Sequence, residues 1–154
     1  MKKVAILIIS VLITTFGCIK DNAGDCYQPP VPFRMQILDK STDENLISNG
    51  TYDADSILIY GYDSLDVKKG VPFFFTTFNN EPNVIISQDL PVISSENITK
   101  TFYIYYDQYD TDTLYVNVEQ TFENNCTYFP YIEVKINGID MELDNQGYTF
   151  LLWK

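Results

Sequence analysis

Residues 132–143 read Ile-Glu-Val-Lys-Ile-Asn-Gly-Ile-Asp-Met-Glu-Leu, with an apolar residue at every second position on each side of Asn137-Gly138. This alternation is typical of strands with one buried face, and Asn-Gly is the preferred pair for a two-residue type I′ turn because both residues tolerate positive φ. The stretch predicts a hairpin in which 136 pairs with 139, 134 with 141 and 132 with 143. All six apolar side chains then share one face, so the alternation and the turn support the same register.

A second hairpin is predicted from about residue 102 to residue 119, around Asp110-Thr111-Asp112. A turn with an even number of residues would place Ile104 opposite Asn117 and divide the apolar side chains between the two faces. A three-residue turn instead pairs 104 with 118 and 106 with 116. In this register the inward side chains are Phe102, Ile104, Tyr106, Leu114, Val116 and Val118.

The rest of the chain after Pro30 consists of similar short apolar segments and shows no convincing helical period. Residues 57–62 and 73–78 are apolar on both faces, which predicts central strands, and a last strand is expected over 148–153. Together these segments make about seven to nine strands without crossover helices. We therefore expect an all-β domain over 31–154, an antiparallel two-sheet sandwich of the immunoglobulin-like or transthyretin-like kind. A small β-barrel is the alternative.

The composition argues against several functions. The chain has 154 residues, enough for one domain or at most two, and its 10 basic and 21 acidic residues give a formal net charge of -11. An acidic surface repels phosphate backbones, so nucleic acid is not expected as a partner. Histidine is absent, which removes the commonest general base and the commonest zinc ligand. We expect no catalytic residues, no metal and no cofactor, and a small carboxylate-based hydrolase is the least favoured function.

The first 17 residues resemble a lipoprotein signal peptide. Two lysines at 2–3 precede an almost wholly apolar run over 4–16. Its length of about 13 residues suits a signal peptide and is short of the roughly 20 that a membrane span needs. Gly17 stands directly before Cys18, an arrangement that resembles the lipobox of bacterial lipoproteins. The resemblance implies cleavage before Cys18, lipid on that cysteine and a tether over 18–30. An ordinary signal peptide or a core helix is the alternative.

Residues beyond Cys18 extend the resemblance to small outer-membrane lipoproteins of Bacteroidota with a β-sandwich domain. It rests on Cys26-Tyr27-Gln28-Pro29-Pro30, on residues 33–42 and on Asn49-Gly50-Thr51-Tyr52. The resemblance implies attachment to the membrane through the N-terminal lipid and an outer-membrane location that faces the periplasm or the cell surface. It brings no catalytic residues with it. The first functional hypothesis is a lipid-anchored cell-envelope protein with a non-catalytic structural or interaction domain.

If Cys18 carries lipid, two cysteines remain, Cys26 and Cys126. Outside the cytoplasm two such cysteines usually pair, so we expect a disulfide between them. The bridge would close a loop of about 100 residues and contribute up to roughly 4.7 kcal/mol through the lost entropy of the unfolded chain. Two free thiols are the alternative.

Three tyrosines form the candidate binding site. The second hairpin places Tyr103, Tyr105 and Tyr115 on its outward face, with Asp107 and Asn117 beside them. Outward tyrosines flanked by polar groups are suited to stacking against sugar rings or peptides. The second functional hypothesis is therefore a glycan- or peptide-binding accessory lipoprotein, with a glycan or an envelope protein as the partner. The alternative is an ordinary outer sheet face partly covered by a loop or a partner sheet.

Three tripeptides resemble the Asp-Ser/Thr-hydrophobic site at which Bacteroidota O-glycosylate exported proteins. They begin at Asp55, Asp63 and Asp112, and each lies in or beside a predicted turn, where access is expected. A coincidence of turn residues is the alternative. The residues that would carry the glycan are Ser56, Ser64 and Thr113.

Overall fold

The computed structural model describes residues 26–154. The expected signal peptide over 1–17 and the expected lipid on Cys18 lie outside the described residues, as does most of the tether over 18–30.

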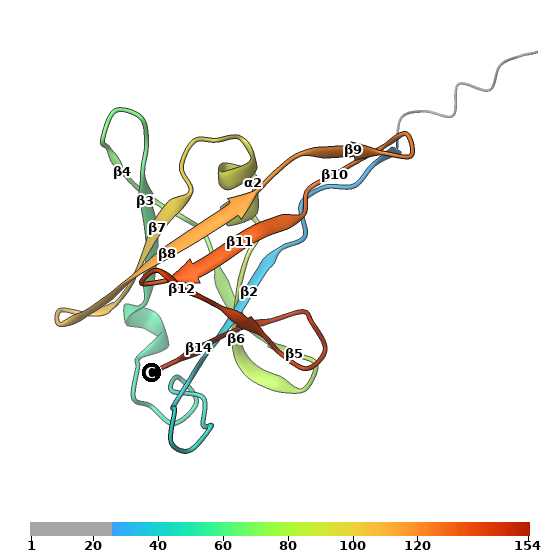
Figure 1. The fold of residues 1–154 in the computed structure, drawn as a ribbon. Helices are drawn as coiled ribbons and strands as arrows, with labels where there is room; N and C mark the ends of the chain where they lie inside the picture. Colours follow the sequence, from blue (N-terminus) through green and yellow to red (C-terminus); the bar gives the residue numbers. More distant parts are fainter. Residues whose placement is uncertain (1–25) are drawn as a thin grey trace, which may run out of the picture.

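Two large sheets pack face to face as a sandwich, and a small third sheet extends from one end (Figure 1). The six-stranded sheet contains, in spatial order, β12 (Ile139–Asp140), β11 (Tyr131–Ile136), β8 (Asp110–Val118), β7 (Thr101–Asp107), β3 (Leu58–Tyr62) and β4 (Lys68–Gly70). The five-stranded sheet contains β13 (Glu142–Leu143), β14 (Phe150–Trp153), β2 (Phe33–Leu38), β6 (Glu81–Ser87) and β5 (Phe74–Phe78). The predicted all-β sandwich is confirmed, and residues 26–154 do not form the alternative closed barrel.

The hydrophobic core lies between the two large sheets. From the five-stranded sheet, β2 contributes Phe33, Met35 and Ile37, which are completely buried. The six-stranded sheet contributes the side chains that were predicted to face inward in the second hairpin, and all six are at most 1% exposed. Alternation along β7 and β8 therefore identified the buried face correctly.

The register predicted for that hairpin is wrong. Asp107 pairs with Asp110 and Ile104 with Asp112, so the turn is Gln108-Tyr109 and not the predicted residues 110–112. The side chain of Asp107 favours this tighter turn, because its Oδ1 accepts a hydrogen bond from the backbone N–H of Tyr109 at 2.7 Å. The actual and predicted registers differ by an even number of residues, and an even shift leaves every side chain on the same face.

The Asn137-Gly138 turn is confirmed, with φ of 50° and 81° and with Ile136 paired to Ile139. The predicted pairing of 132 with 143 is wrong. A bulge in the pairing of β11 with β8 turns Ile132 outward, where it is 54% exposed. Beyond Met141 the chain crosses to the other sheet, where β13 pairs with β14. The six apolar side chains therefore do not share one face.

One helix was not predicted. The helix α2 (Asp89–Ser95) is too short to display a helical apolar period in the sequence, and a 3-10 turn, η2 (Ala54–Ser56), was also missed. The buried Ser94 fastens α2 to β8, because its Oγ donates to the carbonyl of Val116 at 2.8 Å and accepts from the N–H of Val118 at 3.0 Å. No helix within residues 26–154 is long and apolar enough to cross a membrane.

Two further expectations about the sheets need correction. Of the two strands predicted to be central, β3 lies between β7 and β4, but β5 is the edge strand of its sheet, so the prediction is wrong for residues 73–78. The five-stranded sheet is also not purely antiparallel, because β2 and β14 run parallel, with Gln36 beside Leu151 and Leu38 beside Trp153.

The third sheet forms an arm that projects from the sandwich (Figure 1). It contains β1 (Cys26–Tyr27), β10 (Cys126–Tyr128) and β9 (Thr121–Glu123). Cys26 and Cys126 form the expected disulfide, with Cα atoms 4.3 Å apart, so the alternative of two free thiols is excluded in this structure. The disulfide fixes the start of the described chain to the β9–β10 hairpin.

Candidate functional site

The predicted tyrosines lie on the outer face of the six-stranded sheet, which is turned away from the core. Tyr103 and Tyr105 are on β7 and Tyr115 is on β8, and all three are partly exposed. The neighbouring β3 adds side chains that the sequence did not single out, because Tyr60 pairs with Tyr103 and Leu58 with Tyr105. We call this surface the tyrosine face, and it consists of Leu58, Tyr60, Tyr62, Tyr103, Tyr105 and Tyr115.

The rings of the tyrosine face pack mainly against one another. Tyr60 and Tyr103 stack with their centroids 5.2 Å apart, and the edge of Tyr62 meets both rings. The ammonium of Lys68 lies 3.6 Å from the centroid of Tyr60. Burial within this cluster raises the pKa of Tyr60 above its ordinary value. The cross-strand stacking makes the surface rigid and leaves fewer free ring faces than the sequence suggested.

The two polar residues that were expected beside the tyrosines lie at opposite ends of the hairpin. Asp107 is at the tip, where its carboxylate holds the turn. Asn117 lies near the other end of β8, opposite Glu133 of β11, and its amide donates to Glu119 at 3.1 Å. The structure therefore does not bring Asp107 and Asn117 together in one polar site.

The three expected glycosylation residues are all exposed, but their settings differ. Ser56 ends the 3-10 turn η2, and Ser64 lies in the loop between β3 and β4. Thr113 was expected in or beside a turn, but this expectation is wrong. The residue lies in the middle of β8 and pairs with Tyr103. A glycan on Thr113 would therefore stand on the tyrosine face and compete with any partner there.

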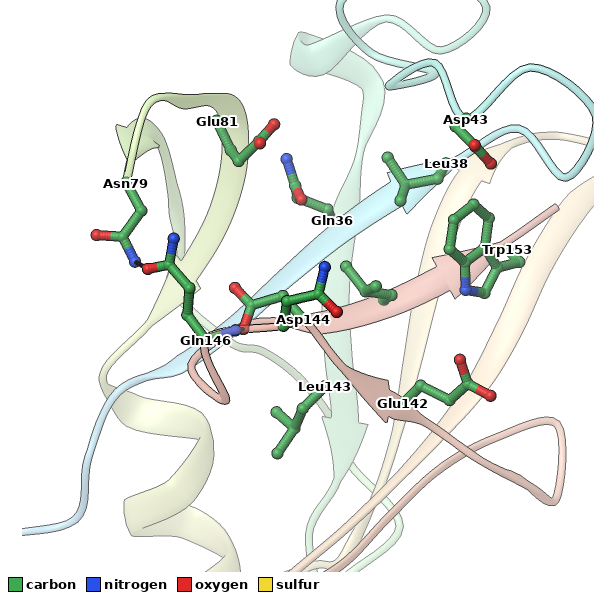
Figure 2. Close-up of a pocket in the computed structure, with 12 residues that line it drawn as sticks. Gln36, Leu38, Asp43, Asn79, Glu81, Glu142, Leu143, Asp144, Gln146 and Trp153 are labelled. Atoms are coloured by element: carbon green, nitrogen blue, oxygen red, sulfur yellow. Dashed lines mark hydrogen bonds between the residues drawn. The ribbon is translucent and has the colours of Figure 1, made fainter.

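A polar groove, which the sequence did not indicate, lies on the opposite side of the sandwich, on the outer face of the five-stranded sheet (Figure 2). Gln36 and Leu38 of β2 and Leu151 and Trp153 of β14 form its floor. Its walls come from the turn between β5 and β6 and from residues 142–146. The cavity measures about 490 Å³, a size typical of small-molecule sites, which span roughly 300 to 1,000 Å³.

Gln36 is the most informative residue of the groove. Its side chain is only 4% exposed, and its amide nitrogen is buried without a hydrogen-bond partner in the described part of the chain. Figure 2 shows this side chain at the centre of the groove, with the nitrogen on the side of Glu81. Buried donors nearly always have an acceptor, so the unpaired amide of Gln36 calls for one from outside the chain.

The rim of the groove is acidic. The carboxylates of Asp43, Glu81, Glu142 and Asp144 line the cavity, and none of its lining side chains is basic. Residues 26–154 contain no group of three or more potential ligands close enough to hold a metal ion. The four carboxylates create a negative field around the groove.

Hydrogen bonds fix the walls of the groove. Burial acts to raise the pKa of Asp144, but hydrogen bonds from the backbone of Tyr148 and Thr149 outweigh burial and hold that pKa below its ordinary value. Asp144 is therefore ionised at neutral pH. The amide of Asn79 donates to the side-chain oxygen of Gln146 at 2.8 Å and joins the two walls at one end, as the dashed line in Figure 2 shows.

Sequence reasoning missed the groove because its residues come from separate segments. Gln36 looked like an ordinary polar residue in an alternating strand, and nothing in the sequence marked four carboxylates among the 21 acidic residues. Trp153, the single tryptophan, was the one available signal. Comparisons of the chain with protein-family profiles, with curated proteins and with solved structures gave no match.

Proposed function

We propose that the protein is a lipid-anchored, non-catalytic interaction module of the outer membrane, which binds a partner protein of the cell envelope through the tyrosine face. The observation that carries this proposal is the open, rigid tyrosine face itself. Leu58 is 52% exposed and Tyr62 is 39% exposed, although both lie on a sheet whose other face is the core. Large apolar and aromatic side chains on an uncovered sheet face are typical of an interaction surface.

A protein partner fits this face better than a glycan. Sugar rings bind over free aromatic faces, whereas Tyr60 is already covered by Tyr103 on one side and lies beneath the ammonium of Lys68. Rigid tyrosines with little conformational freedom left to lose are common at the centres of protein interfaces. Charged residues lie at two sides of the cluster, since Lys135 lies beside Tyr115 and contacts Glu133 at 2.5 Å, and Lys68 lies over Tyr60. This arrangement of an aromatic centre and a charged rim matches interface anatomy.

The position of the arm agrees with a lipid anchor. Cys26 is eight residues after Cys18 in the sequence, so the intervening chain spans at most about 28 Å when fully extended. The disulfide links Cys26, at the end of that short segment, to Cys126 in the β9–β10 hairpin. A lipid on Cys18 would therefore hold the arm near the membrane.

Photo-crosslinking in cells tests the interaction surface. A photoreactive benzoylphenylalanine at position 113, in the middle of the tyrosine face, is expected to yield a discrete protein adduct that disappears with Tyr105→Glu. Position 109 is the matched control, because Tyr109 is 89% exposed at the tip of the β7–β8 hairpin. An identical adduct from position 109, or an adduct that survives Tyr105→Glu, would contradict the proposal.

Two further measurements separate the alternatives. Palmitate labelling is expected for the full chain and should be lost in Cys18→Ala, whereas unchanged labelling would exclude the anchor. Alanine at Tyr103, Tyr105 and Tyr115 is expected to leave the glycan-array profile unchanged. A glycan signal that this triple variant abolishes would instead assign the tyrosine face to glycans.

A further inference from the structure

We infer that the polar groove on the five-stranded sheet is a binding site for a neutral or amino-substituted sugar ring. The groove lies on the side of the sandwich opposite to the tyrosine face, so this site is separate from the proposed protein interface. Four features define it together. They are a buried unpaired amide donor, an acidic rim, an apolar floor and a cavity of about 490 Å³.

The amide of Gln36 requires an acceptor from the ligand. The side-chain nitrogen carries two N–H donors, and no atom of the described chain accepts from it. Gln36 is 4% exposed and lines the groove, so a ligand seated on the floor would lie beside its amide. A ligand without an acceptor, such as a simple cation, would leave this donor unsatisfied.

The rim offers acceptors to the donors of the same ligand. Glu81 and Glu142 are exposed carboxylates with no hydrogen bond to another side chain in residues 26–154, and ionised carboxylates only accept hydrogen bonds. Hydroxyl groups both donate and accept, so a polyhydroxylated ring can satisfy the carboxylates and Gln36 at once. An amino group on the ring would add a favourable charge interaction with the rim.

The floor fits the C–H face of a sugar ring. Leu151 and Trp153 are alternate residues of β14, and both line the floor. Figure 2 shows the indole of Trp153 at the end of the groove away from Asn79. The contact of Asn79 with Gln146 closes that other end. Apolar walls with a few placed polar groups are the usual construction of a small-ligand site.

The charge of the groove sets its selectivity. Four carboxylates and no basic side chain line the cavity, so an anionic sugar would meet repulsion from every side. We therefore expect glucose, glucosamine or N-acetylglucosamine to bind and glucuronic acid to be rejected. A phosphate or sulfate group is excluded for the same reason.

The fluorescence of Trp153 reports directly on the groove, because it is the only tryptophan of the chain. The full chain in detergent is titrated separately with glucose, glucosamine, N-acetylglucosamine and glucuronic acid up to tens of millimolar, a range chosen because single small rings bind weakly. A saturable change with at least one of the first three and none with glucuronic acid is expected. No change with any of them, or equal binding of glucuronic acid, would overturn the inference.

Variants locate the binding. Gln36→Leu is expected to weaken it at least tenfold, whereas the matched change Gln108→Leu, in the exposed β7–β8 turn, should leave the titration curve unchanged. Tyr105→Glu should also leave it unchanged, which separates this site from the tyrosine face. If Gln36→Leu does not fold, Glu81→Gln in the exposed rim takes its place and should weaken glucosamine binding at least threefold. Full affinity in a folded Gln36→Leu or Glu81→Gln protein would place the sugar elsewhere and refute the inference.

Discussion

The ammonium of Lys154 lies 2.6 Å from Oδ1 and 2.7 Å from Oδ2 of Asp110, and this ion pair joins the two large sheets. Lys154 follows β14 of the five-stranded sheet, and Asp110 begins β8 of the six-stranded sheet. The same ammonium lies 2.9 Å from Oδ2 of Asp112 and 4.1 Å from the centroid of Tyr106. Asp110 and Asp112 of the second hairpin therefore both pair with a lysine that is distant in the sequence.

Lys154→Met should destabilise the sandwich. The side chain of Lys154 is 16% exposed and that of Asp112 is 8% exposed, so the substitution leaves two carboxylates without their cation in a poorly solvated place. Removing one partner of a buried pair costs about 3 to 5 kcal/mol, and partial exposure of Asp110 reduces this to roughly 2 to 4 kcal/mol. Urea unfolding at pH 7, followed by circular dichroism, measures the difference.

Lys40→Met is the matched control for that prediction. Lys40 is exposed, and its side chain makes no ion pair in residues 26–154, so the free energy of unfolding should change by less than about 0.5 kcal/mol. A double-mutant cycle with Asp110→Asn should show coupling. Equal losses in Lys154→Met and Lys40→Met would contradict the role of the inter-sheet pair.

Acid should weaken the fold through Asp110. Burial acts to raise the pKa of Asp110, but hydrogen bonds from Lys154 and Tyr52 outweigh it, so the pKa is below its ordinary value of 3.8. A carboxyl with a lowered folded pKa stabilises the protein above its unfolded pKa, and this contribution is lost as the pH falls through the folded pKa. Stability from urea unfolding should therefore be level near pH 6 and fall below about pH 4.

Asp110→Asn tests that assignment. The substitution removes the titrating group, so the free energy of unfolding should decline less between about pH 5 and pH 2.5 than in the unchanged chain. The difference between the two declines should be about the contribution of one carboxyl group. An acid decline of the same size in both proteins would assign the loss to other carboxyls. Asp144, whose pKa is also lowered, is the next group to test.

Alkali should weaken the fold through Tyr106. Burial, and then the negative charge of Asp112, raise the pKa of Tyr106 well above its ordinary value of 10.0. A group with a raised folded pKa stabilises the protein below its unfolded pKa, and that stability is lost as the pH rises beyond about 10. The hydroxyl of Tyr106 lies near the carboxylate of Asp112 but makes no hydrogen bond of good geometry in the described chain. Tyr106→Phe should therefore be nearly neutral at pH 7 and lose less stability than the unchanged chain between pH 9 and pH 11.

The tyrosine face shows how far local patterns carry a prediction. Tyr103, Tyr105 and Tyr115 were assigned to one outward face because they belong to two strands of one hairpin, where alternation decides the face. Tyr60 and Tyr62 were missed because β3 joins this sheet beside β7, and no turn connects the two strands directly. The register of the hairpin was wrong because the choice of turn depended on the side chain of Asp107 and on a bulge at Tyr106.

The polar groove could not be predicted from local sequence patterns. Gln36 and Trp153 share a floor only because β14 returns parallel to β2 at the far end of the sequence. Parallel pairing of this kind depends on the whole path of the chain, because parallel strands are not joined by a hairpin turn that the sequence could indicate. Hairpin turns with positive φ are local features of the sequence, but only Asn137-Gly138 was predicted. Asn79-Asn80 and Asn124-Asn125 also have positive φ and connect paired strands.

Cys126→Ser should lower stability without abolishing the sandwich. The disulfide to Cys26 spans 100 residues of sequence but lies in the arm, outside the core between the large sheets. Its main effect is to restrict the unfolded chain, which contributes typically about 2 to 4 kcal/mol. We expect a lower midpoint of urea unfolding with the near-ultraviolet circular dichroism largely retained.

Reduction provides the control for the disulfide. Dithiothreitol should lower the stability of the unchanged chain to that of Cys126→Ser and leave Cys126→Ser unaffected. Loss of the near-ultraviolet spectrum in the variant would show that the arm is needed for the sandwich to fold. No effect of dithiothreitol on the unchanged chain would exclude a stabilising disulfide.

Gln36→Leu should leave the protein as stable as before or stabilise it by about 1 kcal/mol. A buried polar group without a partner costs free energy, and leucine fills a similar volume without a donor to satisfy. Gln36 is flanked on β2 by Met35 and Ile37, which are completely buried on the opposite face of the sheet, so the core itself is unchanged. Thermal unfolding without sugar measures this effect. A loss of more than about 1 kcal/mol would show that the amide is satisfied in the folded chain. Increased stability, together with weaker sugar binding, would show that glutamine is present at this position for the ligand and at a cost to the fold, whereas unchanged stability with weaker binding would assign it to the ligand without such a cost.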